Sequence, residues 1–95
     1  MKYQIRPGVV LSEVCGEYLL LATMEASRYC PYVYQINETA AFFCHLLKKP
    51  LTVDEIVTIA VEEYEVAPDI LRNDVKQLLR NLLEKGYLLE EEEKT

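Results

Sequence analysis

The side chains with the most reactive chemistry in this chain are three thiols and one imidazole. Cys15, Cys30 and Cys44 share no C-x-x-C spacing, and an odd number of cysteines suits reduced thiols better than a disulfide framework. His45 directly follows Cys44, and adjacent side chains on a helix point to different faces, so the two do not form a chelate. A zinc site needs about four ligands, and no cluster in the sequence supplies them. We therefore expect structural thiols and no metal site.

Patterns typical of catalysis are missing from the sequence. It has no Gly-rich phosphate loop, no nucleophile with a suitable base and no acid pair, since Glu17, Glu25 and Glu38 are scattered. We therefore expect a binding protein that is not an enzyme and needs no cofactor.

More distinctive is a row of cations beside an apolar surface on the last expected helix. At about 100° per residue, one narrow arc of apolar side chains is expected to face the core: Leu71, Val75, Leu78 and Leu82. On one side of this arc, apolar and basic side chains adjoin: Arg72, Lys76, Leu79, Arg80 and Leu83. The other flank is polar: Asp74, Gln77, Asn81 and Glu84. The residues alone leave two interpretations open, a solvated helix surface or one wall of a binding groove.

The elements that would position this helix begin with strands. Residues 9–14 and 17–23 are rich in β-branched and aliphatic side chains and are separated by a Gly, which predicts a hairpin. Residues 24–31 lack periodicity and are expected to form a loop. Residues 32–36 then alternate between two faces, as in a half-buried strand. In a meander this third strand keeps one open edge, which can template an added strand.

Three helices are expected after these strands. Asn37 is a suitable N-cap for the first helix, and Thr52 with Glu55 forms a capping box that opens the second. Pro68 suits the first turn of the third helix, and Gly86 suits its end. The order predicts an α+β fold similar to a winged helix-turn-helix, with a three-stranded antiparallel sheet followed by three helices.

Length and charge limit the function further. The 95 residues suit one domain, expected over 1–89, and the run of glutamates that begins at Glu90 predicts an acidic tail over 90–95. The net charge of −6 opposes nucleic-acid binding. No apolar run approaches the ~20 residues that span a bilayer, and no signal peptide precedes Pro7-Gly8. We expect a cytoplasmic protein with neither a membrane nor a nucleic acid as partner.

One segment gives a family resemblance. Tyr34-Gln35-Ile36-Asn37-Glu38-Thr39-Ala40 resembles the Y-x-L-N-x-T-A segment of the PqqD family. Further segments agree in order and spacing: Pro7-Gly8-Val9, Thr52-Val53-Asp54-Glu55-Ile56, Tyr64-Glu65-Val66, Asp74-Val75 and Leu83-Glu84-Lys85-Gly86-Tyr87-Leu88. The chain departs from the family at Pro50-Leu51, where a Gly is common, and in the long loop before the third strand.

The resemblance implies a RiPP recognition element, which binds the leader of a ribosomally made precursor peptide and presents it to a modifying enzyme. In that family the leader adds as a strand to the third strand and lies against the third helix. Carried over, this implies a main-chain ladder along Tyr32, Val33, Tyr34, Gln35 and Ile36. It also implies a facing wall of Arg72, Lys76, Leu79, Arg80 and Leu83, whose cations would suit an acidic leader. The resemblance also implies a radical S-adenosylmethionine maturase as the enzyme partner. The family takes its name from coenzyme PQQ biosynthesis, which is the pathway that the resemblance implies.

A winged-helix DNA-binding or transcription-regulatory protein is the alternative. Its third helix would offer side chains that can contact a DNA groove: Arg72, Asn73, Lys76, Gln77 and Arg80. The negative net charge, the acidic tail and the lack of a basic wing after the third helix argue against it.

Overall fold

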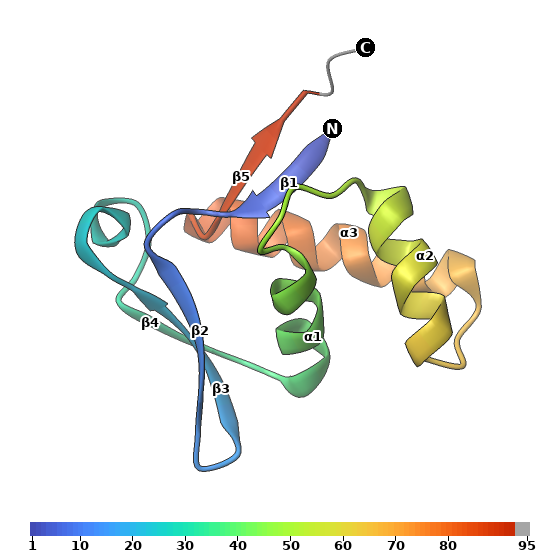
Figure 1. Ribbon diagram of the computed structural model, residues 1–95, viewed down its shortest axis with the longest axis horizontal. Helices are drawn as coiled ribbons and strands as arrows, with labels where there is room; N and C mark the ends of the chain where they lie inside the picture. The colour runs from blue at the N-terminus through green and yellow to red at the C-terminus, as the bar shows by residue number, and fades with distance from the viewer. Residues whose placement is uncertain (93–95) are drawn as a thin grey trace.

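The computed structural model, which describes residues 1–92, contains the expected three-stranded antiparallel sheet (Figure 1). Its strands are β2 (Val9–Val14), β3 (Glu17–Ala22) and β4 (Val33–Ile36), in the order β2-β3-β4. The β2–β3 turn is the two-residue loop Cys15-Gly16, with φ of 52° and 79°, as a tight hairpin requires. Tyr32 precedes β4 rather than belonging to it, so the predicted strand begins one residue later.

Three helices follow the sheet, as predicted: α1 (Glu38–Leu46), α2 (Val53–Glu63) and α3 (Pro68–Lys85). The Asn37 side chain accepts a hydrogen bond from the Ala40 N–H, 2.7 Å between heavy atoms. Thr52 and Glu55 form the reciprocal capping box. Gly86 ends α3 with φ of 88°, and a Cβ there would collide with the Tyr29 carbonyl, so only glycine fits. The α+β class is thereby confirmed.

A second sheet pairs the two ends of the described chain. The strand β1 (Lys2–Ile5) was not predicted, and it pairs antiparallel with β5 (Leu88–Glu91), with Lys2 opposite Glu91 (Figure 1). The first two glutamates of the predicted tail therefore belong to a strand, and residues 93–95 lie outside the described part. The expected loop before β4 also contains a short 3-10 helix, Met24–Arg28.

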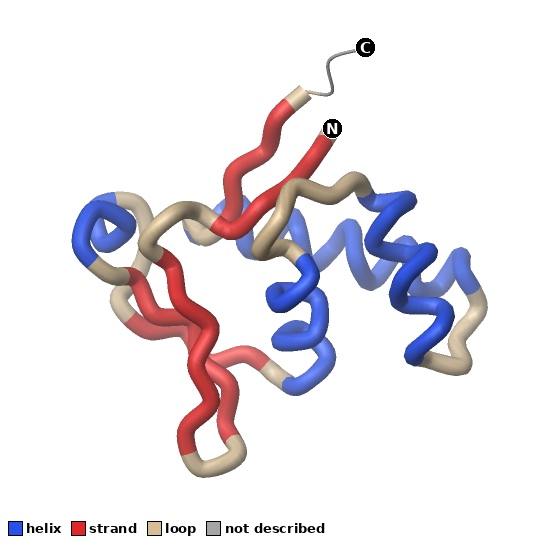
Figure 2. Tube along the Cα trace, in the orientation of Figure 1, coloured by secondary structure: helices blue, strands red, loops and turns tan. Residues whose placement is uncertain are grey.

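The core lies between the three-stranded sheet and the helices. α1 packs beside the sheet, α3 approaches it with its C-terminal end, and α2 lies farther away (Figure 2). The least exposed side chains come from every layer: Leu20, Leu47, Ile56, Leu82 and Tyr87. α3 also buries Leu79, only 3% exposed, which was not predicted as a core position, while the predicted Leu78 is half-buried and packs against the core. Within the described residues no helix has the length and apolarity to cross a membrane.

Candidate functional site

The open edge of β4 is the most distinctive feature for recognition. In the described sheet β4 pairs with β3 only. The Ala22 N–H donates to the Tyr32 carbonyl at 2.9 Å, so this pair is hydrogen-bonded. Hydrogen-bonded and non-bonded pairs alternate in an antiparallel ladder. It follows that Tyr34 and Ile36 also bond toward β3, whereas Val33 and Gln35 direct their N–H and C=O groups away from it.

The start of β4 is fastened to the C-terminal end of α3. The Tyr34 ring stacks on Tyr87 with centroids 5.7 Å apart, and Lys85 Nζ lies 4.8 Å from the Tyr34 ring centroid. The buried Tyr87 donates its hydroxyl to the Pro31 carbonyl at 2.8 Å. Burial is the main cause that raises the Tyr87 pKa, so the phenol keeps the proton that it donates. These contacts hold β4 and α3 in a fixed relation.

Farther along α3 a hollow of about 310 Å³ separates that helix from the end of β4 and the start of α1. Its floor and sides include Asn37, Ala40 and Phe43, and α3 contributes Asp74 and Leu78. At 3.6 residues per turn, Asp74, Leu78 and Lys85 fall on one flank of α3. Lys85 on this flank contacts the Tyr34 ring, and Asp74 and Leu78 line the hollow beside Asn37, which follows β4, so this flank is the side of α3 nearest β4. We call the space between the flank and the outward edge of β4 the β4–α3 groove.

The predicted basic row lies on the opposite flank of α3. Arg72 forms an ion pair with Asp54 of α2. Lys76 and Arg80 line a separate hollow of about 280 Å³, with Tyr3 of β1 on its far side. The remaining predicted members behave differently: Leu83 lines the same hollow half-buried, and Leu79 is buried below it.

The structure therefore does not bring the two predicted walls together. Among the predicted ladder residues, Val33 and Gln35 are exposed while Tyr34 and Ile36 face inward, as their alternation predicts. The same alternation places Tyr32 on the inner face, but Tyr32 precedes β4 and is 74% exposed. The ladder residues lie beside the Leu78 flank of α3, not beside the basic row. Peptide binding by either flank stays a prediction at this point.

The sequence also carries a signal for the flank of α3 that lies nearest β4. Asp74 and Leu78 share one side of the helical arc, but the apolar spacing predicts Leu78 in the core and leaves Asp74 on the polar flank. Helical spacing defines two flanks equally well. It does not say which of them adjoins the sheet, because that depends on how α3 packs.

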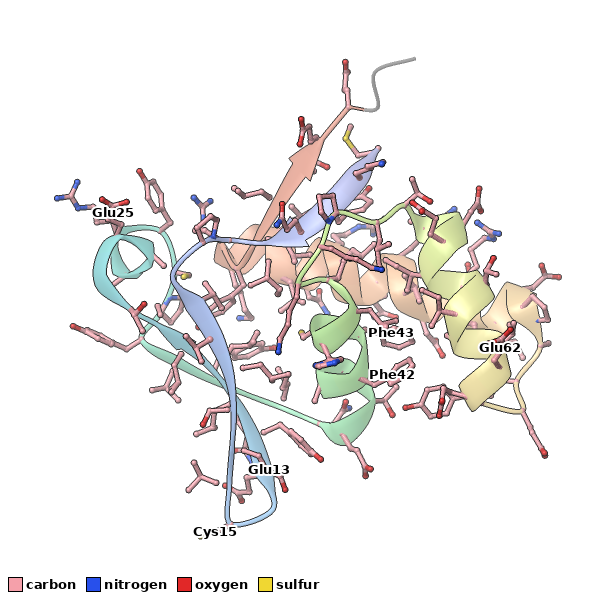
Figure 3. All side chains as sticks on the ribbon, viewed as in Figure 1. Glu13, Cys15, Glu25, Phe42, Phe43 and Glu62 are labelled. Atoms are coloured by element: carbon pink, nitrogen blue, oxygen red, sulfur yellow. The ribbon has the colours of Figure 1, made fainter. Side chains whose placement is uncertain are left out.

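The thiols are placed apart. Cys15 is exposed at the tip of the β2–β3 hairpin (Figure 3), and Cys30 and Cys44 are buried. Burial raises the pKa of Cys44 to about 12 and also raises that of Cys30, so both stay protonated near neutrality. No described group of three or more His, Cys, Asp or Glu side chains has the arrangement of a metal site.

Comparison with known proteins gives one family. The model of coenzyme PQQ synthesis protein D (PqqD) matches residues 17–88, which include the sheet edge and all three helices. No curated protein sequence matches significantly.

Solved structures share the fold over nearly the whole chain. TbiB1 in complex with the TbiA(beta) leader peptide is 22% identical, with a TM-score of 0.74 and coverage of 95% of this chain and 99% of that one. Lasso peptide synthetase B1 complexed with the leader peptide is 22% identical, with a TM-score of 0.73 and coverage of 95% and 100%. The PqqD truncation of Methylobacterium extorquens PqqCD, described as a stand-alone RiPP recognition element, is 25% identical, with a TM-score of 0.73 and coverage of 94% and 89%.

Proposed function

Since the chain belongs to the PqqD family, we propose that it binds the leader of a ribosomally synthesised precursor peptide by strand addition to β4 and presents it to a modifying enzyme. The observation that carries this proposal is the open edge of β4, where Val33 and Gln35 direct their backbone N–H and C=O groups away from β3. Main-chain bonds along such an edge give affinity, and pockets beside it give side-chain specificity. Two chains of the same fold are complexed with leader peptides, which supports peptide rather than DNA as the ligand.

In this proposal the leader lies between β4 and the Leu78 flank of α3. Leu78 supplies a half-buried apolar contact, and Asp74 and Lys85 place one charge of each sign along the groove. The mixed charge removes the earlier reason to expect an acidic leader, because that expectation rested on the basic row. The modifying enzyme is proposed to be a radical S-adenosylmethionine maturase, which a maturase gene beside this one would support.

The two flanks of α3 allow a matched test. Leu78 and Leu83 are both half-buried leucines on the same helix, one on each flank. The ligand is a fluorescein-labelled synthetic leader of a candidate precursor, a short reading frame sought near the gene of this chain, and it is titrated by fluorescence anisotropy. Losing about half of a leucine's burial costs on the order of 1 kcal/mol, so Leu78→Ala should weaken binding about fivefold. Leu83→Ala should change it less than twofold.

The same titration tests the basic row directly. Arg80→Glu reverses a charge on the far flank, and Lys85→Glu reverses one beside Tyr34. If the leader occupies the β4–α3 groove, only the Lys85 variant changes the affinity. A loss with Arg80→Glu and Leu83→Ala but not with the groove variants would place the leader on the far flank and overturn this assignment. Circular dichroism confirms that each variant is folded.

A further inference from the structure

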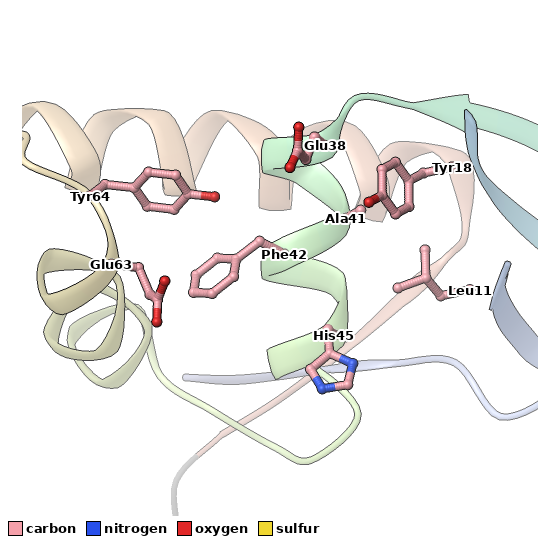
Figure 4. Close-up of a pocket in the computed structure, with 8 residues that line it drawn as sticks. All are labelled: Leu11, Tyr18, Glu38, Ala41, Phe42, His45, Glu63 and Tyr64. Atoms are coloured by element: carbon pink, nitrogen blue, oxygen red, sulfur yellow. The ribbon is translucent and has the colours of Figure 1, made fainter. Parts of the chain in front are cut away.

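A second hollow lies on the other side of α1 from the β4–α3 groove. It has a volume of about 390 Å³ and lies between the β2–β3 hairpin, α1 and the end of α2 (Figure 4). α1 separates the two sites, because Ala40 and Phe43 line the groove hollow whereas Ala41 and Phe42 line this one. We call it the α1–α2 pocket.

Aromatic rings make up much of this pocket. The Phe42 ring packs edge-on against Tyr64, with centroids 5.3 Å apart and planes at 90°. Tyr18 projects from the hairpin on the opposite side of α1 with its hydroxyl toward Ala41, and the Tyr64 hydroxyl points toward α1 from the other side (Figure 4). The pocket therefore offers ring faces and phenolic oxygens to one occupant.

Carboxylates supply the charge. Glu38 at the start of α1 and Glu63 at the end of α2 both line the pocket and are exposed. The eight described residues that line it include one imidazole, His45, and no lysine or arginine (Figure 4). The negative field reaches Tyr18, whose pKa is raised chiefly by Glu13, then by burial and by Glu38. An occupant that combines a positive charge with a flat apolar face complements these features.

We propose that the α1–α2 pocket binds the guanidinium of an arginine side chain carried by the modifying enzyme. A guanidinium stacks on aromatic faces and donates paired hydrogen bonds to carboxylates, which an ammonium cannot do in the same geometry. The identity of this partner rests on the proposed function, because an adaptor must hold leader and enzyme together. The position of α1 between the two sites allows both to be occupied at once.

A small probe tests the pocket without the enzyme. Uniformly ¹⁵N-labelled protein is titrated with N-acetyl-arginine amide and, in parallel, with N-acetyl-citrulline amide, which has nearly the same shape without the charge. The arginine probe should shift the amide signals of Tyr18, Phe42 and Tyr64 in a saturable way. The citrulline probe should produce at most a third of those shifts at equal concentration. Equal shifts from both probes, or arginine shifts that map elsewhere, would overturn the proposal.

Variants then test the carboxylates. An exposed charge pair changes affinity by about 1.5- to 5-fold, so Glu38→Gln combined with Glu63→Gln should weaken the arginine probe by about 2- to 25-fold. Because Glu38 also lies in the first turn of α1, where a carboxylate favours the helix, Glu63→Gln is measured alone as well. The matched control is Glu62→Gln, an exposed neighbour that does not line the pocket (Figure 3). Unchanged affinity in both pocket variants would contradict the proposal.

The test of the α1–α2 pocket can succeed or fail independently of the test of leader binding. The pocket variants should bind the labelled leader within twofold of the wild-type protein, since they lie across α1 from the groove. Arginine binding without leader binding would refute the proposed function alone. Leader binding without any arginine response would refute the pocket alone.

Discussion

Proline at Gln35 tests strand addition through a single backbone N–H. Val33 and Gln35 are the β4 residues whose N–H groups point away from β3, so a leader strand is expected to accept from them. Proline has no N–H to donate. One lost hydrogen bond is worth about 0.5–1.5 kcal/mol, which corresponds to about a 2- to 12-fold loss of leader affinity. Tyr34→Pro should act differently, because it removes a bond to β3 and lowers the melting temperature instead.

The opposite edge of the same sheet provides the control. The Thr23 N–H donates to the Gly8 carbonyl at 2.8 Å, and the alternation from this pair directs the Glu13 N–H outward from β2. Glu13→Pro therefore imposes the same kind of change on an edge that the leader does not use. Each variant is titrated with the labelled leader by fluorescence anisotropy and checked by thermal unfolding.

Two results would refute the reasoning. If Val33→Pro and Gln35→Pro both bind the leader within twofold of the wild-type protein, no strand adds to β4. If Glu13→Pro weakens binding as much as they do, the loss reflects general disturbance of the sheet and not the missing donor.

Three further outcomes follow from the backbone and the thiols. Gly86→Ala should lower the free energy of unfolding by about 2 kcal/mol or more, since it adds a backbone collision to a left-handed φ. Gly16 has open space around it, so Gly16→Ala should lower the same free energy by only about 1 kcal/mol. Urea unfolding measures both variants, and equal losses would contradict the collision at Gly86. Iodoacetamide at pH 8 should modify the exposed Cys15 and spare the buried Cys44 until urea is added, as peptide mass spectrometry would show. Folding raises the Cys44 pKa to about 12 from about 8.5 in the unfolded chain, so the native state keeps its proton longer and the free energy of unfolding should fall between about pH 9 and pH 12. Cys44→Ala should flatten that pH dependence, and an unchanged slope would exclude the thiol as its source.

Sequence alone predicted the elements whose ends are marked by local chemistry. Helix ends coincide with Asn37, the Thr52–Glu55 box and Gly86. Asn37 and the box satisfy backbone groups within three or four residues of themselves, and Gly86 supplies the left-handed φ that ends α3. The alternation of residues 33–36 likewise predicted which side chains face inward, because strand geometry is set residue by residue; it failed at Tyr32, which precedes the strand and is exposed. The family segment that begins at Tyr34 lies across this strand and the first cap.

Sequence could not predict the contacts between distant segments. β1 is a short strand, and its partner β5 lies more than 80 residues away, so nothing local distinguishes it. The apolar arc of α3 likewise contains Leu78 and Leu79 side by side, and either could have been buried. Packing against α2 and β1 buries Leu79 and leaves Leu78 in the groove.

The position of the groove depended on the same kind of contact. A helical period is a property of the backbone and defines two flanks without ranking them. Which flank adjoins β4 follows from the rotation of α3 about its own axis, and long-range contacts set that rotation. The Tyr34–Tyr87 stack holds one end of the helix, and the Arg72–Asp54 pair holds the other against α2. The open strand was therefore apparent from the residues, whereas its facing wall was decided by tertiary packing.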